Sequence, residues 1–225
     1  IYNRLEIARI DILLIFFLKK MKSIQINRHP IFTTEIFSFE LPNFKMWQER
    51  IKQIVLVEEN SSFNTKPDNE CNIKASRTAW NSHERYAVVK ELSIELEKYL
   101  QMFIENEGYD VPRLELMNSW INWYKKDQHA MPHDHRNSLA VVVFIDVEDT
   151  NAKLCFHADN SIVLIKKQDS SINFSNFKTV NAKNGTVIFF DGSIRHSVTA
   201  NNSNKNRISA AFNYITRYPE RRNEY

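Results

Sequence analysis

Three histidines and one arginine in the second half of the sequence form a pattern that could do metal chemistry. His133 and His135 flank an aspartate in "MPHDHRNS", just before the apolar run "LAVVVFIDV", and His196 lies far downstream in "GSIRHSV". Side chains at positions i and i+2 of a strand share one face. His133 and His135 can therefore converge on one point while Asp134 faces away, and His196 from a distant strand would complete a three-ligand site.

Arg207 adds a second chemical requirement to this pattern. It opens the run "RISAAFNYI", eleven residues after His196. Its guanidinium is permanently charged and can bind a carboxylate through two parallel hydrogen bonds. Non-heme Fe(II) oxygenases hold the metal with three ligands on one side and leave positions open for oxygen and a chelating cosubstrate. The four residues therefore favour iron with a dicarboxylate cosubstrate, while zinc bound by three histidines remains an alternative.

The elements that must position these residues are predicted to be short strands. Runs rich in β-branched or aromatic residues alternate with turns containing Asn, Asp, Ser and Gly. Several short strands at such spacing are typical of a sandwich or a barrel. The predicted runs cover residues 114–124, 138–147, 153–158, 161–167, 185–190, 195–200 and 207–215.

The first half of the chain has a helical period instead. Apolar residues in 44–57 recur at i, i+4, i+7 and i+8, which predicts an amphipathic helix. A second helix is predicted over 83–106, with Asn81 or Ser82 as its cap and Gly108 just beyond its end.

Together these elements predict a mainly β (α+β) architecture within one domain over residues 21–225. A β core over 114–215 forms a double-stranded β-helix, the cupin-like jelly roll, and helical support over 44–108 packs outside it. Residues 1–20 contain the apolar run "IDILLIFFL", which is shorter than the roughly 20 residues of a membrane span. We expect residues 1–20 to be an upstream extension outside the working fold, with a short helix packed on the domain as the alternative.

Composition limits the classes of partner. The net charge is +3 and no block of like charges occurs, which argues against nucleic-acid binding. The chain has two cysteines, Cys71 and Cys155, and their spacing matches no metal finger. Free thiols are typical of a reducing compartment. We therefore predict a cytoplasmic protein with no nucleic-acid or membrane partner.

Three segments, taken in order, resemble a known family. "SWINWYKKDQHAMPHDHRNS", "NGTVIFFDGSIRHSV" and "NRISAAFNYI" are similar to the 2-oxoglutarate- and Fe(II)-dependent oxygenases, in particular to a branch found in marine bacteria and their phages. The resemblance runs from about Met21 to Ile215. It implies Fe(II), 2-oxoglutarate and O2, supported by ascorbate, in the hydroxylation of a small-molecule or peptidyl substrate that the sequence does not identify.

The resemblance also implies roles for individual residues. His133 and His196 would bind iron, and Arg207 would bind the distal carboxylate of 2-oxoglutarate with help from Ser209. Asn122 would hydrogen-bond the cosubstrate or the substrate.

Most 2-oxoglutarate oxygenases have an acid at the position of His135, whereas the branch that this chain resembles often has His-x-His. We predict His135 as the third ligand, with a carboxylate from Asp191 or Asp159 as the alternative. Residues expected in the substrate pocket are Trp120, Tyr124, His157 and Asn213, and a core or rim position is the alternative for His157.

Two rival functions fit the same residues. One is a cupin-like metalloenzyme with three histidines that does not use 2-oxoglutarate, and Arg207 would be dispensable for it. The other is a jelly roll that binds a ligand without catalysis.

Overall fold

The structure is a computed structural model of the chain, and it describes residues 35–60, 73–109, 113–157 and 177–216. The expected extension at 1–20, the predicted strand at 161–167, Cys71 and Asp159 lie outside these residues. Among the described helices, none is long and apolar enough to cross a membrane.

The described strands form two antiparallel sheets. The larger sheet has the strand order β1 (Ile36–Glu40), β9 (Thr186–Asp191), β6 (Leu139–Asp146), β11 (Arg207–Thr216), β4 (Leu114–Tyr124) and β3 (Ser76–Arg77). The smaller sheet has the order β2 (Ile73–Lys74), β5 (His129–His133), β10 (His196–Val198), β7 (Leu154–His157) and β8 (Phe177–Val180).

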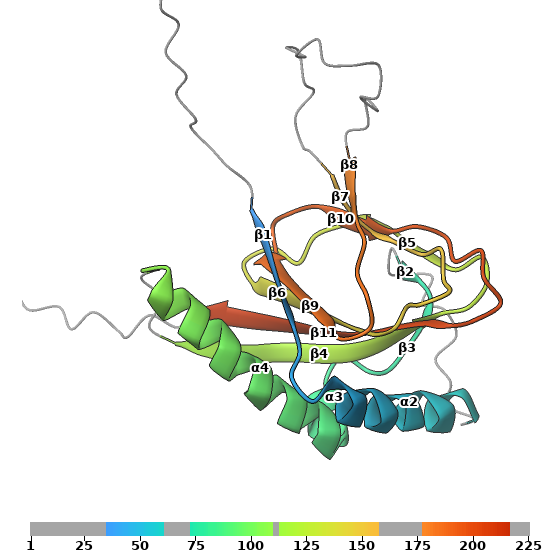
Figure 1. Ribbon diagram of the computed structural model, residues 1–225, viewed down its shortest axis with the longest axis horizontal. Coiled ribbons are helices and arrows are strands. Elements are labelled where there is room, and N and C mark those ends of the chain that lie inside the picture. Colours follow the sequence, from blue (N-terminus) through green and yellow to red (C-terminus); the bar gives the residue numbers. More distant parts are fainter. Residues whose placement is uncertain (1–34, 61–72, 110–112, 158–176, 217–225) are drawn as a thin grey trace, which may run out of the picture. The chain divides into compact units, whose positions relative to one another are not determined.

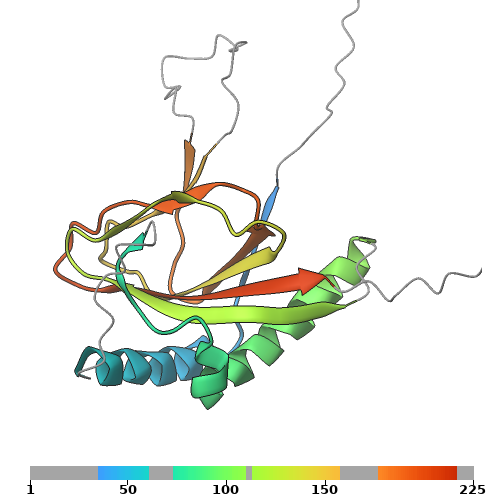
Figure 2. The same ribbon diagram turned by 180° about the vertical axis from the view of Figure 1, so that it is seen from behind.

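The helices α2 (Phe44–Asn60), α3 (Ser82–Arg85) and α4 (Ala87–Asn106) cover one face of the larger sheet. The smaller sheet lies over the opposite face (Figure 1), and the view from behind shows the same order of layers (Figure 2). The predicted jelly roll with helices packed outside it is therefore confirmed.

The alternation of β4 and β11 gives the larger sheet its two faces. Ile121 and Trp123 of β4 belong to the core beneath the helices, whereas Tyr124 belongs to the core between the sheets. Because successive side chains of a strand point to opposite faces, Trp120 and Asn122 also face the space between the sheets.

β11 follows the same rule. Ile208, Ala210 and Phe212 lie under the helices, whereas Arg207, Ser209 and Asn213 face the smaller sheet.

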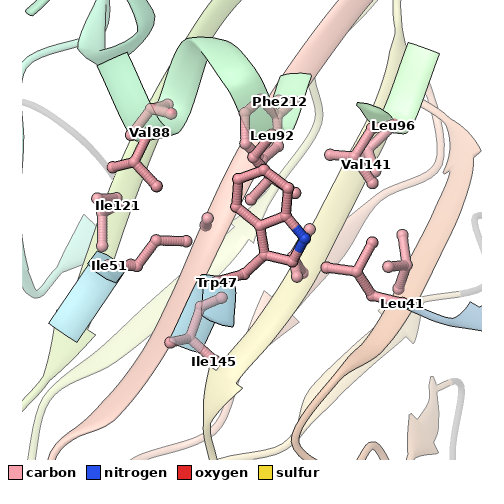
Figure 3. Packing of buried hydrophobic residues seen from close by; sticks show 14 of the residues in the cluster. Leu41, Trp47, Ile51, Val88, Leu92, Leu96, Ile121, Val141, Ile145 and Phe212 are labelled. Atoms are coloured by element: carbon pink, nitrogen blue, oxygen red, sulfur yellow. The ribbon is translucent and has the colours of Figure 1, made fainter. Parts of the chain in front are cut away.

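Trp47 of α2 anchors the helical layer to the sheet. Its indole is 7% exposed and belongs to the cluster that includes Leu92 of α4, Phe212 of β11 and Ile145 of β6. Figure 3 shows this indole at the centre of the layer, between the helices and the sheet. This packing holds β6 and β11 against the helices, so the opposite faces of these strands are left for the site.

The predicted helix over 83–106 is two helices, and this prediction needs correction. Tyr86 between α3 and α4 has an extended backbone, with φ −121 and ψ 114. Its hydroxyl donates a hydrogen bond to the buried carboxylate of Glu58 on α2. Asn81 precedes α3 but makes no side-chain cap hydrogen bond. A local helical period could not reveal this break, because the contact with Glu58 comes from another helix.

The predicted end of α4 is confirmed at Gly108. Gly108 has φ 72, a conformation that glycine adopts without strain. Its N–H donates to the carbonyl of Glu105 at 3.3 Å, and the N–H of Tyr109 donates to that of Ile104 at 3.0 Å. These two bonds satisfy carbonyls that the helix end would otherwise leave unpaired.

Candidate metal and cosubstrate site

The fold brings His133, His135 and His196 together. One ring nitrogen from each lies within 4.8 Å of the others. The ring centroids are 4.5 Å apart for His133 and His196, 4.8 Å for His135 and His196, and 5.4 Å for His133 and His135. Among the described residues, this is the one group of three or more potential metal ligands.

A β-bulge aims His133 at this group. His133 ends β5 and pairs with His196, the first residue of β10, while Ala130 pairs with Val198. From His196 to Val198 there are two steps along β10, and from Ala130 to His133 there are three along β5, so β5 carries one extra residue. Because strand faces alternate, this extra residue lets both Ala130 and His133 point between the sheets.

His135 reaches the group by a route different from the predicted one. β5 ends at His133, so His135 does not lie on the same strand. Its backbone N–H donates instead to the carbonyl of Gly192 at 2.7 Å, which holds it beside the loop that follows β9. Asp134 is exposed, as predicted, and its Oδ1 accepts a hydrogen bond from the N–H of Arg136.

The hydrogen bonds of His133 and His196 set their tautomers. Nδ1 of His133 lies 2.7 Å from the carbonyl of Met131, and Nδ1 of His196 lies 2.9 Å from that of Ile194. A carbonyl can only accept, so each Nδ1 carries the proton and each Nε2 has a free lone pair. These two rings are ready to bind a metal through Nε2, and imidazole suits iron.

Burial keeps the three imidazoles neutral. Loss of solvent, followed by repulsion from neighbouring histidines, lowers the pKa of His196 to about 3 and that of His135 to about 4. Burial also lowers the pKa of His133. Metal binding requires neutral histidines, so the site holds its ligands in the reactive state at neutral pH.

These pKa values predict how the stability of the metal-free protein depends on pH. Between pH 6.5, the ordinary pKa of histidine, and about 4, the unfolded chain binds protons at His135 and His196 that the folded chain does not. The free energy of unfolding should therefore be highest above pH 6.5 and fall as the pH is lowered, by about 1.4 kcal/mol per pH unit for each histidine. Urea unfolding at pH 7, 6 and 5 measures this slope. His196→Gln should reduce the slope by about 1.4 kcal/mol per pH unit, because one of the two histidines no longer contributes.

Arg207 is the buried cation of the site. It begins β11, is 1% exposed and faces the space between the sheets. Its Nε donates to the carbonyl of Ala152 at 3.2 Å and its Nη1 to Oγ of Ser209 at 3.1 Å. The guanidinium also lies over the rings of Tyr124 and Phe144, at 5.2 and 5.3 Å from the centroids.

No carboxylate in the described part of the chain forms an ion pair with Arg207. The guanidinium is buried, so its charge is poorly solvated, and this burial lowers its pKa. A buried charge without a partner costs several kcal/mol. A ligand with a carboxylate would offset this cost, so the chemistry of Arg207 fits a dicarboxylate.

Two neighbouring polar atoms also lack a partner among the described residues. Nε1 of Trp120 and Oδ1 of Asn122 are both buried and make no hydrogen bond. Asn122 lies opposite Ser209 across β4 and β11, and the Trp120 ring meets His135 edge-on at 5.5 Å between centroids. Buried polar atoms are nearly always satisfied in folded proteins, so these two atoms are available to hydrogen-bond a polar ligand.

Two of the sequence candidates lie apart from the histidine group. Asp191 is exposed at the end of β9, and its Oδ1 accepts hydrogen bonds from the backbone and hydroxyl of Ser193. His157 is on β7 with Nε2 at 2.7 Å from Oγ of Ser197. Its neighbour Phe156 belongs to the core between the sheets, so alternation turns His157 to the outer face.

Gly192 is a site residue that the sequence patterns did not single out. A Cβ at this position would lie 2.5 Å from Oγ of Ser138 and 2.7 Å from its backbone oxygen. The same glycine accepts the hydrogen bond from His135. The absence of a side chain therefore lets the loop containing His135 pack against the end of β9.

Gly192→Ala should disturb the metal site. The new methyl group would push the loop away, so we expect a loss of about 1–3 kcal/mol in stability, as for overpacking elsewhere, together with weaker Co(II) binding. Urea unfolding and Co(II) titration measure the two effects. Gly108→Ala is the matched control, because it introduces strain at φ 72 with nothing within 4 Å of the new Cβ. Unchanged Co(II) affinity in Gly192→Ala would contradict the assigned contact.

The comparisons with known proteins agree with this geometry. The family described as "Putative 2OG-Fe(II) oxygenase" matches residues 118–213, which include all three histidines and Arg207. The matched region, residues 118–213, is a domain of the 2-oxoglutarate- and Fe(II)-dependent oxygenases. This oxygenase is thus a non-heme iron enzyme whose cofactor and cosubstrate are Fe(II) and 2-oxoglutarate. No curated protein matches the sequence significantly.

Solved structures share the fold of this oxygenase at low sequence identity. A prolyl-4-hydroxylase from Pseudomonas putida has a TM-score of 0.59 at 10% identity, covering 83% of this chain and 95% of that one. HygX from Streptomyces hygroscopicus, solved with nickel, 2-oxoglutarate and hygromycin B, has a TM-score of 0.58 at 13% identity, covering 83% and 84%. A viral collagen prolyl hydroxylase from Paramecium Bursaria Chlorella virus-1, solved with 2-oxoglutarate, has a TM-score of 0.50 at 12% identity, covering 80% and 96%.

Proposed function

We propose that this oxygenase is a hydroxylase in which His133, His135 and His196 hold Fe(II) and Arg207 binds the distal carboxylate of 2-oxoglutarate. The observation that carries the proposal is a fully buried guanidinium with no carboxylate partner in the described chain, in the same intersheet space as the three neutral histidines. A metal site alone would not need such a cation.

Each residue around the cosubstrate has a defined task. Arg207 would bind the carboxylate, and Ser209 accepts from its Nη1 and keeps the guanidinium in place. Asn122 and Trp120 offer an acceptor and a donor to groups of the cosubstrate or substrate. Tyr124 and Phe144 cover the faces of the guanidinium and exclude water from it.

Bound Fe(II) supplies the oxygen chemistry, in which 2-oxoglutarate becomes succinate and CO2 and one oxygen atom enters a substrate C–H bond. The protein would contribute the ligands, the orientation of the cosubstrate and the exclusion of water. We propose a cytoplasmic location, a small-molecule or peptidyl substrate, no nucleic-acid or membrane partner and support of turnover by ascorbate. The relation to a marine bacterial and phage branch remains a prediction.

Succinate release tests the proposal directly. The protein incubated with Fe(II), 2-oxoglutarate, ascorbate and air should form succinate slowly even without the true substrate, and a chelator should stop it. Candidate substrates that fit should accelerate the release. Calorimetry with the Mn(II)-loaded protein gives an independent measure of 2-oxoglutarate binding. If the loaded protein neither binds 2-oxoglutarate nor releases succinate, the proposal fails.

A further inference from the structure

His135 differs from the other two histidines in what sets its tautomer. The Nδ1 partners of His133 and His196 are backbone carbonyls two residues earlier in the chain. The partner of His135 Nδ1 is a side chain, Oδ1 of Asn213, at 2.8 Å. Asn213 lies on β11 of the larger sheet, 78 residues away in sequence. The orientation of His135 therefore depends on a single amide from another strand.

Asn213 is itself held in one orientation by a second amide. Its Nδ2 donates to Oδ1 of Asn118 at 2.9 Å. The two asparagines are direct partners across β4 and β11, next to an irregularity in the register between Asn213 and Tyr214. Asn213 is 4% exposed, so solvent does not compete for these hydrogen bonds. Both ends of its amide are occupied, which makes Asn213 a poor candidate for the substrate contact that the sequence led us to expect.

We propose that Asn118 and Asn213 form an amide relay that positions His135 as a metal ligand. The inference rests on the proposed function, because it assumes that the three histidines hold the metal. Asn118 occupies the donor end of the Asn213 amide, so the acceptor end faces His135. This acceptor keeps the proton on Nδ1 and leaves the lone pair on Nε2 for the metal. Asn118 and Asn213 are thus positioning residues that do not touch the metal themselves.

The direction of the Asn213 amide decides whether His135 can bind. An amide turned the other way would present Nδ2 to Nδ1 of His135, and the imidazole proton would move to Nε2. His135 would then have no lone pair to offer the metal. The relay therefore selects the binding tautomer, in the way that hydrogen-bond partners orient metal-bound histidines in other proteins.

Binding of Co(II) to the whole 225-residue chain tests the relay without any need for activity. Asn213→Leu removes the acceptor and should weaken Co(II) binding about 10- to 100-fold, the usual effect of losing such a partner. Asn213→Asp keeps an acceptor and cannot donate, so it should bind Co(II) as tightly as the wild type or more tightly. Asn118→Leu should have an effect in the same direction as Asn213→Leu but smaller, because the acceptor remains. The visible absorption of bound Co(II) should change in Asn213→Leu and persist in Asn213→Asp.

The aspartate variant separates positioning from packing. A buried carboxylate should lower the melting temperature of the metal-free protein, and Co(II) should then raise that temperature more than it does in the wild type. Asn201→Ala is the matched control: Asn201 is also buried, and its Nδ2 donates to the carbonyls of Tyr124 and Lys205 rather than to a histidine. It should lose stability and keep its Co(II) affinity.

The outcomes distinguish the relay from the proposed function. If the wild type does not bind Co(II), the metal site itself fails and the relay fails with it. If the wild type binds Co(II) and Asn213→Leu binds it equally well, the relay alone is overturned. If Asn213→Asp is as weak as Asn213→Leu, the amide serves packing and the relay is again overturned.

Discussion

Arg207→Met should reduce succinate formation from 2-oxoglutarate by about 30- to 4,000-fold, the range that corresponds to losing about 2–5 kcal/mol from a buried charge pair. The guanidinium is 1% exposed, so water cannot replace it as a partner for the carboxylate. Methionine keeps much of the side-chain volume and removes the charge. We expect most of the loss as a higher KM for 2-oxoglutarate, and calorimetry with the Mn(II)-loaded protein should show weaker binding.

Stability and metal binding supply the controls for this variant. Arg207 has no carboxylate partner among the described residues, so its replacement should cost the metal-free protein little stability. Co(II) affinity should also persist, because none of the three histidines is changed. Arg50→Met removes an exposed guanidinium that pairs with Glu91 and should leave turnover unchanged. Full activity in Arg207→Met would favour the rival metalloenzyme that does not use 2-oxoglutarate.

His196→Ala should abolish metal binding and turnover together. His196 is 4% exposed and begins β10, opposite His133. Its loss leaves two of three ligands, so we expect Co(II) affinity to fall by more than the 10- to 100-fold typical of losing an outer hydrogen-bond partner. Co(II) titration followed by visible absorption measures this directly, and the succinate assay should give no signal.

His129→Ala is the matched control for the ligand variant. His129 begins β5, four residues before His133, and its Nδ1 lies 3.4 Å from the carbonyl of Asp127. It does not belong to the histidine group. Co(II) affinity should therefore stay within about two-fold of the wild type, as for surface changes away from special features. Equal Co(II) affinity in His196→Ala would place the metal elsewhere.

Local patterns were sufficient to predict the longer elements. The apolar runs at 114–124 and 207–215 became β4 (Leu114–Tyr124) and β11 (Arg207–Thr216) almost to the residue. β11 buries both faces over most of its length and β4 over its second half, so their apolar and aromatic signal is nearly continuous. The short strands β2 and β3 were not predicted, because two residues carry no measurable period. Nor were β1, β5 and β8, of four or five residues each.

The sequence by itself determined which residue types do the chemistry. Three histidines and an arginine, each beside an apolar run, were enough to indicate a metal and a dicarboxylate. Few other side chains can fill these roles. Residue type and order along the chain are local properties. They do not depend on how the strands pair.

The tertiary structure alone decided how these residues meet. The extra residue in β5 turns His133 inward, the bare backbone of Gly192 holds the loop of His135, and Asn213 reaches His135 from the other sheet. Each of these contacts joins segments far apart in sequence. The partner segment sets the register of β5, the close approach of the His135 loop and the tautomer of His135. The local sequence around each residue carries no signal that identifies this partner.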